Sequence, residues 1–237
     1  MKLVCCNFKM NLLKNDIENY IKVIHNYVDK NNLIIFPSIP YINNFKQNGF
    51  IVGSQNISFK EFGSITGDTS ILQLKEMGIT YTIIGHSERR EFFNDNNYIN
   101  DKIKLALNNN IKIILCIGEK NKTNEKETYD FLKQELDEAI KNNINLINND
   151  NLIIAYEPIW AIGSGIIPDN TILSSTIKYI KDYLNKTYQL NSKILYGGSV
   201  NLNNIDELEK INEIDGYLIG SFSLKPENIL NLSTHIR

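Results

Sequence analysis

The stretch LIIAYEPIWAIGSG, residues 152–165, decides how the rest of the chain is interpreted. Residues 152–156 form a short apolar run, as expected for a strand that is buried on both faces. Glu157 follows, where burying an unpaired carboxylate would be costly, and Pro158 favours an extended backbone at Glu157. Residues 159–165 form a largely apolar loop ending in glycines, which fits a lid that closes over a bound molecule. The alternative is an ordinary strand-to-helix loop with a packed tryptophan and an exposed glutamate.

Short apolar runs alternate with amphipathic segments along the whole sequence, a pattern typical of parallel β–α units. The expected strands are residues 3–6, 33–36, 50–54, 81–84, 111–117, 152–156, 193–196 and 216–219, and expected helical segments include 17–28, 101–107, 131–140 and 172–184. Eight units is the number that closes a (β/α)8 barrel. No linker rich in Pro, Gly or Ser divides the chain, so we expect a single domain over residues 1–237.

An open, doubly wound parallel sheet is the alternative α/β architecture. It would carry a Gly-rich turn after its first strand. Residues 6–9 read CNFK, which is no such turn. The sequence therefore favours the closed barrel.

Composition and charge narrow the classes of partner. Lys and Arg number 25 against 27 Asp and Glu, a net charge of −2 that favours neither nucleic acid nor an anionic membrane as a partner. No apolar run approaches the ~20 residues of a membrane span, and we expect no signal peptide. Cys5, Cys6 and Cys116 suggest neither a disulfide framework nor a metal-ligand spacing, so a cytoplasmic location is the simplest expectation.

Polar residues follow the ends of the first and fourth expected strands. Asn7 and Lys9 follow the first, and if this segment is extended both side chains face the barrel axis. His86 lies where the fourth strand passes into a helical turn. Because the amides at a helix N-terminus disfavour a positive charge, we expect a neutral imidazole at pH 7.

Glycine-containing turns follow the seventh and eighth expected strands. They are the segments 197–199 and 220–221, with sequences GGS and GS. Glycines let backbone N–H groups approach an anion, and barrels commonly bind phosphate at this place. Together with Gly163 of the expected lid, these turns form a three-sided candidate phosphate site.

Several of these segments together resemble the triosephosphate isomerase family. In chain order they read NFKMN (7–11), EFGSITGD (61–68), GHSERR (85–90), EPIWAIG (157–163) and the glycine turns described above. The resemblance implies a TIM barrel without cofactor or metal. It also implies interconversion of dihydroxyacetone phosphate and D-glyceraldehyde 3-phosphate, an isomerisation of glycolysis and gluconeogenesis.

The resemblance implies a role for each matching residue. Glu157 would take a carbon-bound proton, and neutral His86 would move protons between the oxygens of an enediolate. Lys9 would stabilise the anionic substrate and intermediate, and Asn7 would help to orient them. The phosphate would be held by backbone amides of Gly163, Ser199, Gly220 and Ser221.

The resemblance also implies supporting roles for two further residues, Glu88 and Thr66. Glu88 would lie behind the reacting groups, within reach of Lys9. Thr66 belongs to a loop that in the family forms a dimer and reaches into the partner's active site, so a homodimer is expected. Asp68 in this loop replaces the glutamate that the family usually has.

The sequence departs from the family pattern at two other places near the site. Ser221 replaces a second glycine and would be strained if its position required a positive φ. The end of the lid, residues 164–168, reads SGIIP, with bulkier residues and an early proline that should stiffen the hinge. We expect altered lid kinetics and unaltered chemistry.

Rival functions come from other classes. A Schiff-base aldolase would use Lys9 as nucleophile. A zinc aldolase is disfavoured because the histidines His25, His86 and His235 are scattered. A sugar-phosphate binding protein without turnover is the non-enzymatic alternative, but it would be expected to have lost the base or the electrophile.

Overall fold

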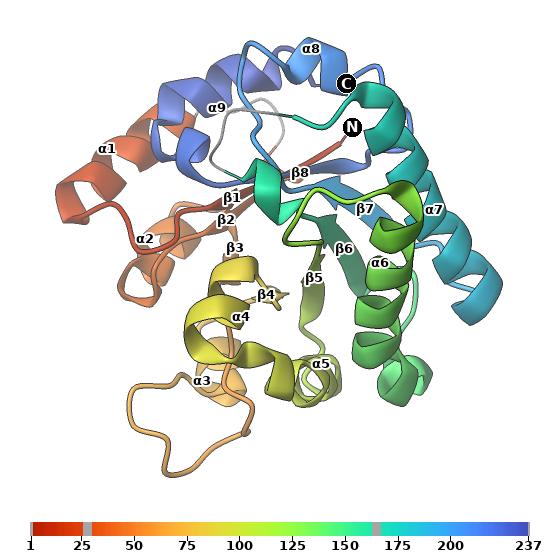
Figure 1. Cartoon of the computed structure of the whole chain (residues 1–237). Coiled ribbons are helices and arrows are strands. Elements are labelled where there is room, and N and C mark those ends of the chain that lie inside the picture. The colour runs from red at the N-terminus through yellow and green to blue at the C-terminus, as the bar shows by residue number, and fades with distance from the viewer. Residues whose placement is uncertain (1, 26–29, 163–166, 237) are drawn as a thin grey trace.

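Eight parallel strands form a closed barrel in a computed structural model that describes residues 2–25, 30–162 and 167–236 (Figure 1). The strands are β1 (Leu3–Asn7), β2 (Leu33–Phe36), β3 (Ile51–Ser54), β4 (Tyr81–Ile84), β5 (Lys112–Ile117), β6 (Leu152–Tyr156), β7 (Lys193–Tyr196) and β8 (Gly216–Ile219). Each strand pairs with the next, and β8 pairs with β1, where Val4 lies opposite Tyr217. This closure confirms the (β/α)8 barrel and contradicts the open sheet.

Helices surround the barrel (Figure 1). Within the described ranges they are α1 (Lys14–Ile24), α2 (Ile42–Gln47), α3 (Ile71–Glu76), α4 (Ser87–Phe93), α5 (Ile99–Asn108), α6 (Glu125–Ile140), α7 (Asn170–Tyr188), α8 (Ile205–Leu208) and α9 (Pro226–Ser233). The shorter 3-10 segments are η1 (Ile39–Tyr41), η2 (Asp95–Tyr98), η3 (Lys141–Leu146), η4 (Ile159–Ala161) and η5 (Ser221–Leu224). The expected strands agree with the observed ones to within one residue, and three expected helical segments lie inside α5, α6 and α7. Residues 26–28 of the expected segment 17–28 lie outside the described residues.

Two apolar layers hold this architecture together. One fills the barrel and consists of Cys5, Ile34, Phe36, Ile83, Ile114, Cys116, Ile153, Ala155, Leu195 and Leu218. The other lies between the strands and the surrounding helices and includes Val4, Cys6 and Phe8. Successive residues of a strand point to opposite faces, which explains why Cys5 lies inside the barrel and Cys6 outside it.

All three cysteine thiols are buried and unpaired. Burial raises the pKa of Cys6 to about 12 and those of Cys5 and Cys116 well above their usual value. A thiol that stays protonated is a poor nucleophile, so these side chains act as core residues.

Candidate active site

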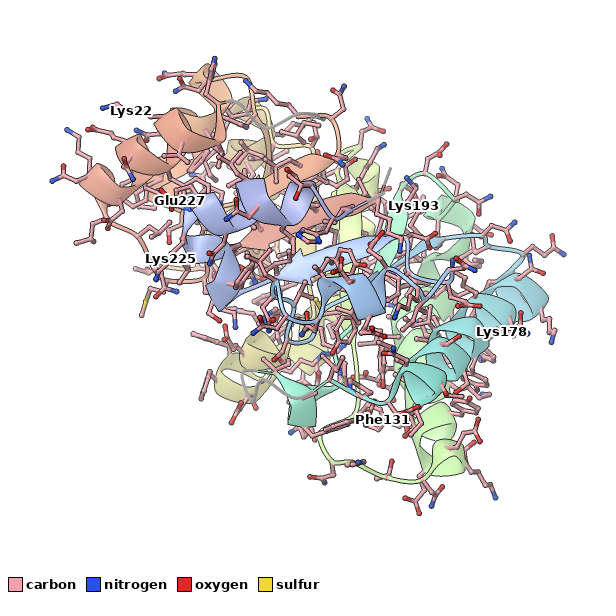
Figure 2. All side chains as sticks on the ribbon, turned by 90° about the horizontal axis from the view of Figure 1, so that it is seen from above. Lys22, Phe131, Lys178, Lys193, Lys225 and Glu227 are labelled. Carbon is pink, nitrogen blue, oxygen red and sulfur yellow. The ribbon has the colours of Figure 1, made fainter. Side chains whose placement is uncertain are left out.

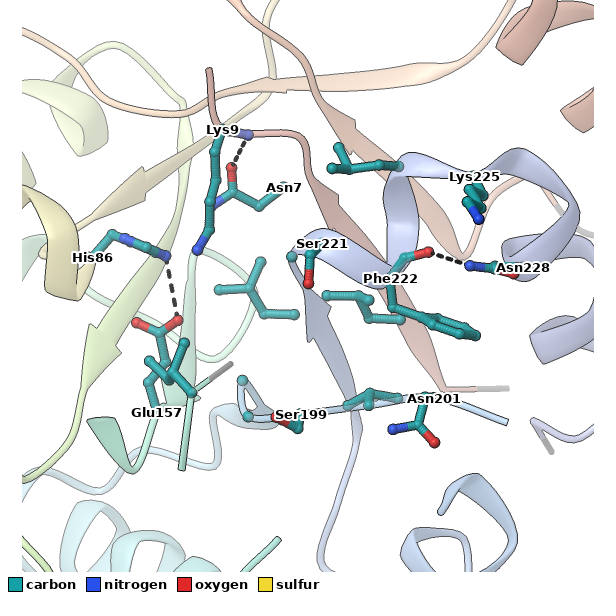
Figure 3. A pocket seen from close by; sticks show the side chains of 18 residues that line it. Asn7, Lys9, His86, Glu157, Ser199, Asn201, Ser221, Phe222, Lys225 and Asn228 are labelled. Atoms are coloured by element: carbon teal, nitrogen blue, oxygen red, sulfur yellow. Dashed lines mark hydrogen bonds and ion pairs between the residues drawn. The ribbon is translucent and has the colours of Figure 1, made fainter. Parts of the chain in front are cut away.

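A cavity of about 500 Å³ lies at the carboxyl ends of the strands and collects most of the residues expected there (Figure 3). Its wall contains Asn7 from the end of β1, Lys9 just beyond it, His86 after β4 and Glu157 after β6, together with the turns that follow β7 and β8. Because all strands of a parallel barrel end at the same face, residues far apart in the sequence meet here. Gly163 lies outside the described residues.

Glu157 is buried rather than exposed, with 4% of its surface accessible. Its backbone N–H donates to Ile117 O at 2.8 Å, which continues the β5–β6 pairing. Its Oε1 lies 3.5 Å from His86 Nε2. The other oxygen, Oε2, is buried and accepts no hydrogen bond from a nitrogen or oxygen within the described ranges. Burying such an acceptor is costly, so this carboxylate is held at the cavity at some expense of stability.

His86 caps the N-terminus of α4, as the sequence predicts. Its Nδ1 accepts the N–H of Glu88 at 3.3 Å. A ring nitrogen that accepts a hydrogen bond carries no proton, so Nε2 carries the proton of the neutral ring and faces Glu157.

Lys9 corrects one expectation. The backbone at residues 7–9 is not extended throughout, because Lys9 has a φ of 51° in the left-handed region. Its N–H donates to Asn7 Oδ1 at 3.0 Å, and its carbonyl accepts from Ser38 Oγ at 3.0 Å and Gln55 Nε2 at 2.8 Å. These bonds offset the strain of a side-chain-bearing residue in this conformation. Both side chains still line one cavity, and Lys9 Nζ lies 2.6 Å from Glu88 Oε1.

The candidate phosphate side of the cavity is formed by Ser199, Gly220 and Ser221. Ser199 Oγ donates to Ala161 O at 3.1 Å, which connects the turn after β7 to η4. Ser221 begins η5 and is not among the described residues with positive φ, so serine there is unstrained. The hinge residues 164–166 lie outside the described residues, and the expected effect on lid kinetics stays a prediction.

Sequence reasoning missed Glu119, which anchors the start of the expected lid. Trp160 Nε1 donates to Glu119 Oε1 at 2.8 Å, and the Tyr156 hydroxyl lies 3.1 Å from Oε1 and 3.2 Å from Oε2. Burial raises the pKa of this carboxyl. The sequence signals for Glu119 are its position just after β5 and the resemblance of residues 116–119 to the family, and neither indicates its role, because its partners come from a different strand and loop.

The loop between β3 and α3 projects away from the barrel (Figure 1). Phe62 in this loop is 74% exposed, and Thr66 is exposed as well. A neighbouring cavity of about 620 Å³ borders the active site at Lys9, His86 and Glu88 and has apolar walls from Met10, Ile39, Phe92 and Phe93. Exposed apolar groups beside an apolar cavity are typical of a protein–protein contact surface.

The described part of the chain contains neither a cluster of metal ligands nor a membrane-spanning helix. No three His, Cys, Asp or Glu side chains lie together as metal ligands there. None of the described helices is both long and apolar enough to cross a membrane.

Comparison of the chain with known proteins finds similarity to one family. The family model described as triosephosphate isomerase matches residues 2–236. A protein of Malacoplasma penetrans named triosephosphate isomerase is 38% identical, over 98% of this chain and 97% of its own. Proteins with the same name from Neurospora crassa and Alkaliphilus oremlandii are 37% and 34% identical, over 93% and 97% of this chain and the same shares of their own lengths.

Proposed function

The chain belongs to the triosephosphate isomerase family, and we propose that Glu157, His86, Lys9 and Asn7 carry out its reaction. The protein interconverts dihydroxyacetone phosphate and D-glyceraldehyde 3-phosphate, an isomerisation of the intramolecular oxidoreductase class that belongs to glycolysis. We further propose that residues 1–237 form one domain around this site.

Glu157 is the base in this proposal. The observation that carries it is the buried Oε2, which has no nitrogen or oxygen partner in the described ranges and belongs to a carboxylate 3.5 Å from an imidazole. An oxygen that accepts no N–H or O–H is free to take a proton from carbon. Glu157 would remove the proton from one carbon and return it to the neighbouring carbon. Aldose and ketose are interconverted in this way.

His86 is the electrophile. Its Nε2–H faces the cavity while Nδ1 accepts the backbone N–H of Glu88, so the neutral ring can donate to a substrate oxygen and move protons between the two oxygens of the enediolate. Pairing a glutamate base with a neutral imidazole is the established chemistry of the family.

Lys9 and Asn7 hold the negative charge of the substrate and intermediate. In the free protein the Lys9 ammonium lies 2.6 Å from Glu88 Oε1, so it is already placed at the cavity edge. Backbone amides of Ser199, Gly220 and Ser221, with Gly163 outside the described residues, are proposed to hold the phosphate. Fixed donors of this kind stabilise developing charge without reorganising.

The test is steady-state turnover of D-glyceraldehyde 3-phosphate by the protein and its Glu157→Gln variant. Removing a general base should lower kcat by about 10²–10⁴-fold. Glu18→Gln, which makes the same change on the exposed side of α1, is the matched control and should retain activity. A Glu157→Gln variant that turns over like the control would refute Glu157 as base.

The rival functions draw no support from the geometry. A Schiff-base aldolase needs Lys9 as a nucleophile, whereas Glu88 engages this ammonium. Borohydride in the presence of substrate would trap such an adduct on Lys9, and we expect none. A binding protein without turnover has no use for a buried carboxylate beside a neutral imidazole.

We also propose that the protein is a homodimer. Phe62 at the tip of one protomer's loop would enter the cavity beside Lys9 and His86 of the other. The family resemblance supports a position for Thr66 at the partner's active site. The same resemblance and the three buried, free thiols support a cytoplasmic location.

A further inference from the structure

The active-site cavity extends beyond the groups that the isomerisation uses. Its volume of about 500 Å³ lies in the range of pockets that bind drug-sized ligands. A molecule of three carbons and one phosphate would fill only part of it. Figure 3 shows Lys9, His86 and Glu157 at one end and Lys225, Asn228 and Asn201 at the other. Ser199 and Ser221, from the proposed phosphate site, lie between them. We call the end formed by Asn201, Phe222, Lys225 and Asn228 the outer end.

The outer end presents donors of hydrogen bonds. Asn228 Nδ2 donates one N–H to Phe222 O at 3.0 Å, which orients this side chain and leaves its second N–H. Asn201 Oδ1 accepts from the N–H of Asn203 at 2.9 Å, so its NH₂ group points elsewhere. Lys225 is exposed and forms no ion pair with any described residue.

Charge at the outer end has one sign. The charged side chains among the described residues that line the whole cavity are Lys9, Glu157 and Lys225. Glu157 lies beside His86 at the reacting end, so no lining carboxylate opposes Lys225. An ammonium with amide donors and no carboxylate favours an anion.

We propose that the outer end is a second anion subsite, through which the cavity binds a diphosphate. One phosphoryl group would occupy the backbone amides of Ser199, Gly220 and Ser221, and the second would lie beside Lys225. The inference rests on the proposed phosphate site. A diphosphate fits because its second phosphoryl group is bonded directly to the first and projects away from the reacting end. Such a ligand competes with the triose phosphate and links turnover to the level of diphosphates.

Calorimetric titration with inorganic phosphate and with pyrophosphate, in buffer free of divalent cations, tests the proposal. The variant is Lys225→Met. The matched control is Lys178→Met, which removes the same charge from the exposed face of α7, well away from Lys225 in Figure 2. We expect pyrophosphate to bind the unaltered protein more tightly than phosphate. The ratio of the two affinities should fall about two- to fivefold in Lys225→Met, the range for an exposed ion pair, and stay unchanged in Lys178→Met.

Three results would overturn the proposal: no tighter binding of pyrophosphate than of phosphate, an equal change in both variants, or a loss of phosphate affinity itself in Lys225→Met. Calorimetry requires no turnover, so failure of the subsite and failure of the proposed reaction are told apart. ADP identifies the source of the diphosphate. Tighter binding of ADP than of pyrophosphate supports an organic diphosphate in contact with Phe222, and weaker binding supports the inorganic one.

Discussion

Two glycines determine where the carboxylate of Glu157 can lie. A Cβ on Gly118 would overlap the backbone carbonyl of Glu157, and a Cβ on Gly197 would lie 2.6 Å from its Cγ. Glycine is needed at both positions because the chains after β5 and β7 approach Glu157 more closely than a side chain allows. The proposed base is therefore positioned by two neighbouring residues that lack side chains.

Substituting Gly197 with alanine should displace Glu157 with little effect on phosphate binding. A displacement of about 1 Å can cost 10²-fold in rate, so kcat should fall by about that factor while KM changes far less. Turnover of D-glyceraldehyde 3-phosphate measures both constants, and thermal unfolding of the variant checks that the barrel is intact. An unchanged kcat in a folded Gly197→Ala variant would contradict the steric role.

For single residues, the sequence predicts which residues line the site better than it predicts their backbone conformations. The motifs indicated Asn7, Lys9, His86 and Glu157, and all four line one cavity. The left-handed backbone of Lys9 was not predictable, because the groups that hold it, Ser38 and Gln55, are 29 and 46 residues away in the chain. The sequence indicates Gly197 only as part of a phosphate turn, since its closeness to Glu157 depends on the pairing of β6 with β7.

Among the elements, α5 is joined to η2 and to the chain after β3 by a buried charge. Lys102 of α5 is 2% exposed, and its Nζ lies 2.5 Å from Asp95 Oδ1 and 2.8 Å from Asn56 Oδ1. Arg89 of α4 lies 3.5 Å from the same carboxylate oxygen. Burial lowers the pKa of Lys102, while its contact with Asp95 opposes this shift.

Lys102→Met should destabilise the protein strongly, because it leaves Asp95 buried with its nearest cation removed. Breaking a buried pair in this way typically costs about 3–5 kcal/mol of unfolding free energy. Lys104→Met, an exposed change on the same helix, should stay within about 0.5 kcal/mol. Urea unfolding of the two variants makes the comparison, and similar midpoints would show that the buried pair contributes little.

The contact between η4 and the chain after β5 should respond to pH. Burial raises the pKa of Glu119, which accepts the Trp160 Nε1–H, so this carboxyl should take up a proton above the usual value of about 4.3 as pH falls. The neutral acid is a weaker acceptor, and the environment of the indole changes. Trp160 is the only tryptophan in the sequence, so its fluorescence reports this step directly. The transition should be absent from Glu119→Gln; its persistence there would assign it to another group.

For the whole molecule, local patterns predicted the architecture because each β–α unit has its own apolar signal and the count of units determines closure. Neither the extent of the active-site cavity nor the cavity beside it could be predicted. Lys225 and Asn228, for example, occur in an unremarkable segment at the start of α9, yet both line the cavity, because η5 connects this segment to the end of β8. Such features depend on the relative placement of loops, which have no periodicity.

Assembly is the property of the whole molecule that Phe62 should control. Phe62→Asp places a charge where the proposed dimer buries an aromatic ring, and loss of such an anchor should weaken self-association at least about tenfold. Sedimentation at several protein concentrations measures this, with Phe131→Asp on the outer side of α6 as control (Figure 2). Because the accepting cavity borders Lys9 and His86, activity should fall with dilution of the variant and recover at high concentration. A Phe62→Asp protein that sediments like the control would place the subunit contact elsewhere, and a monomeric one with full activity would show that each barrel works alone.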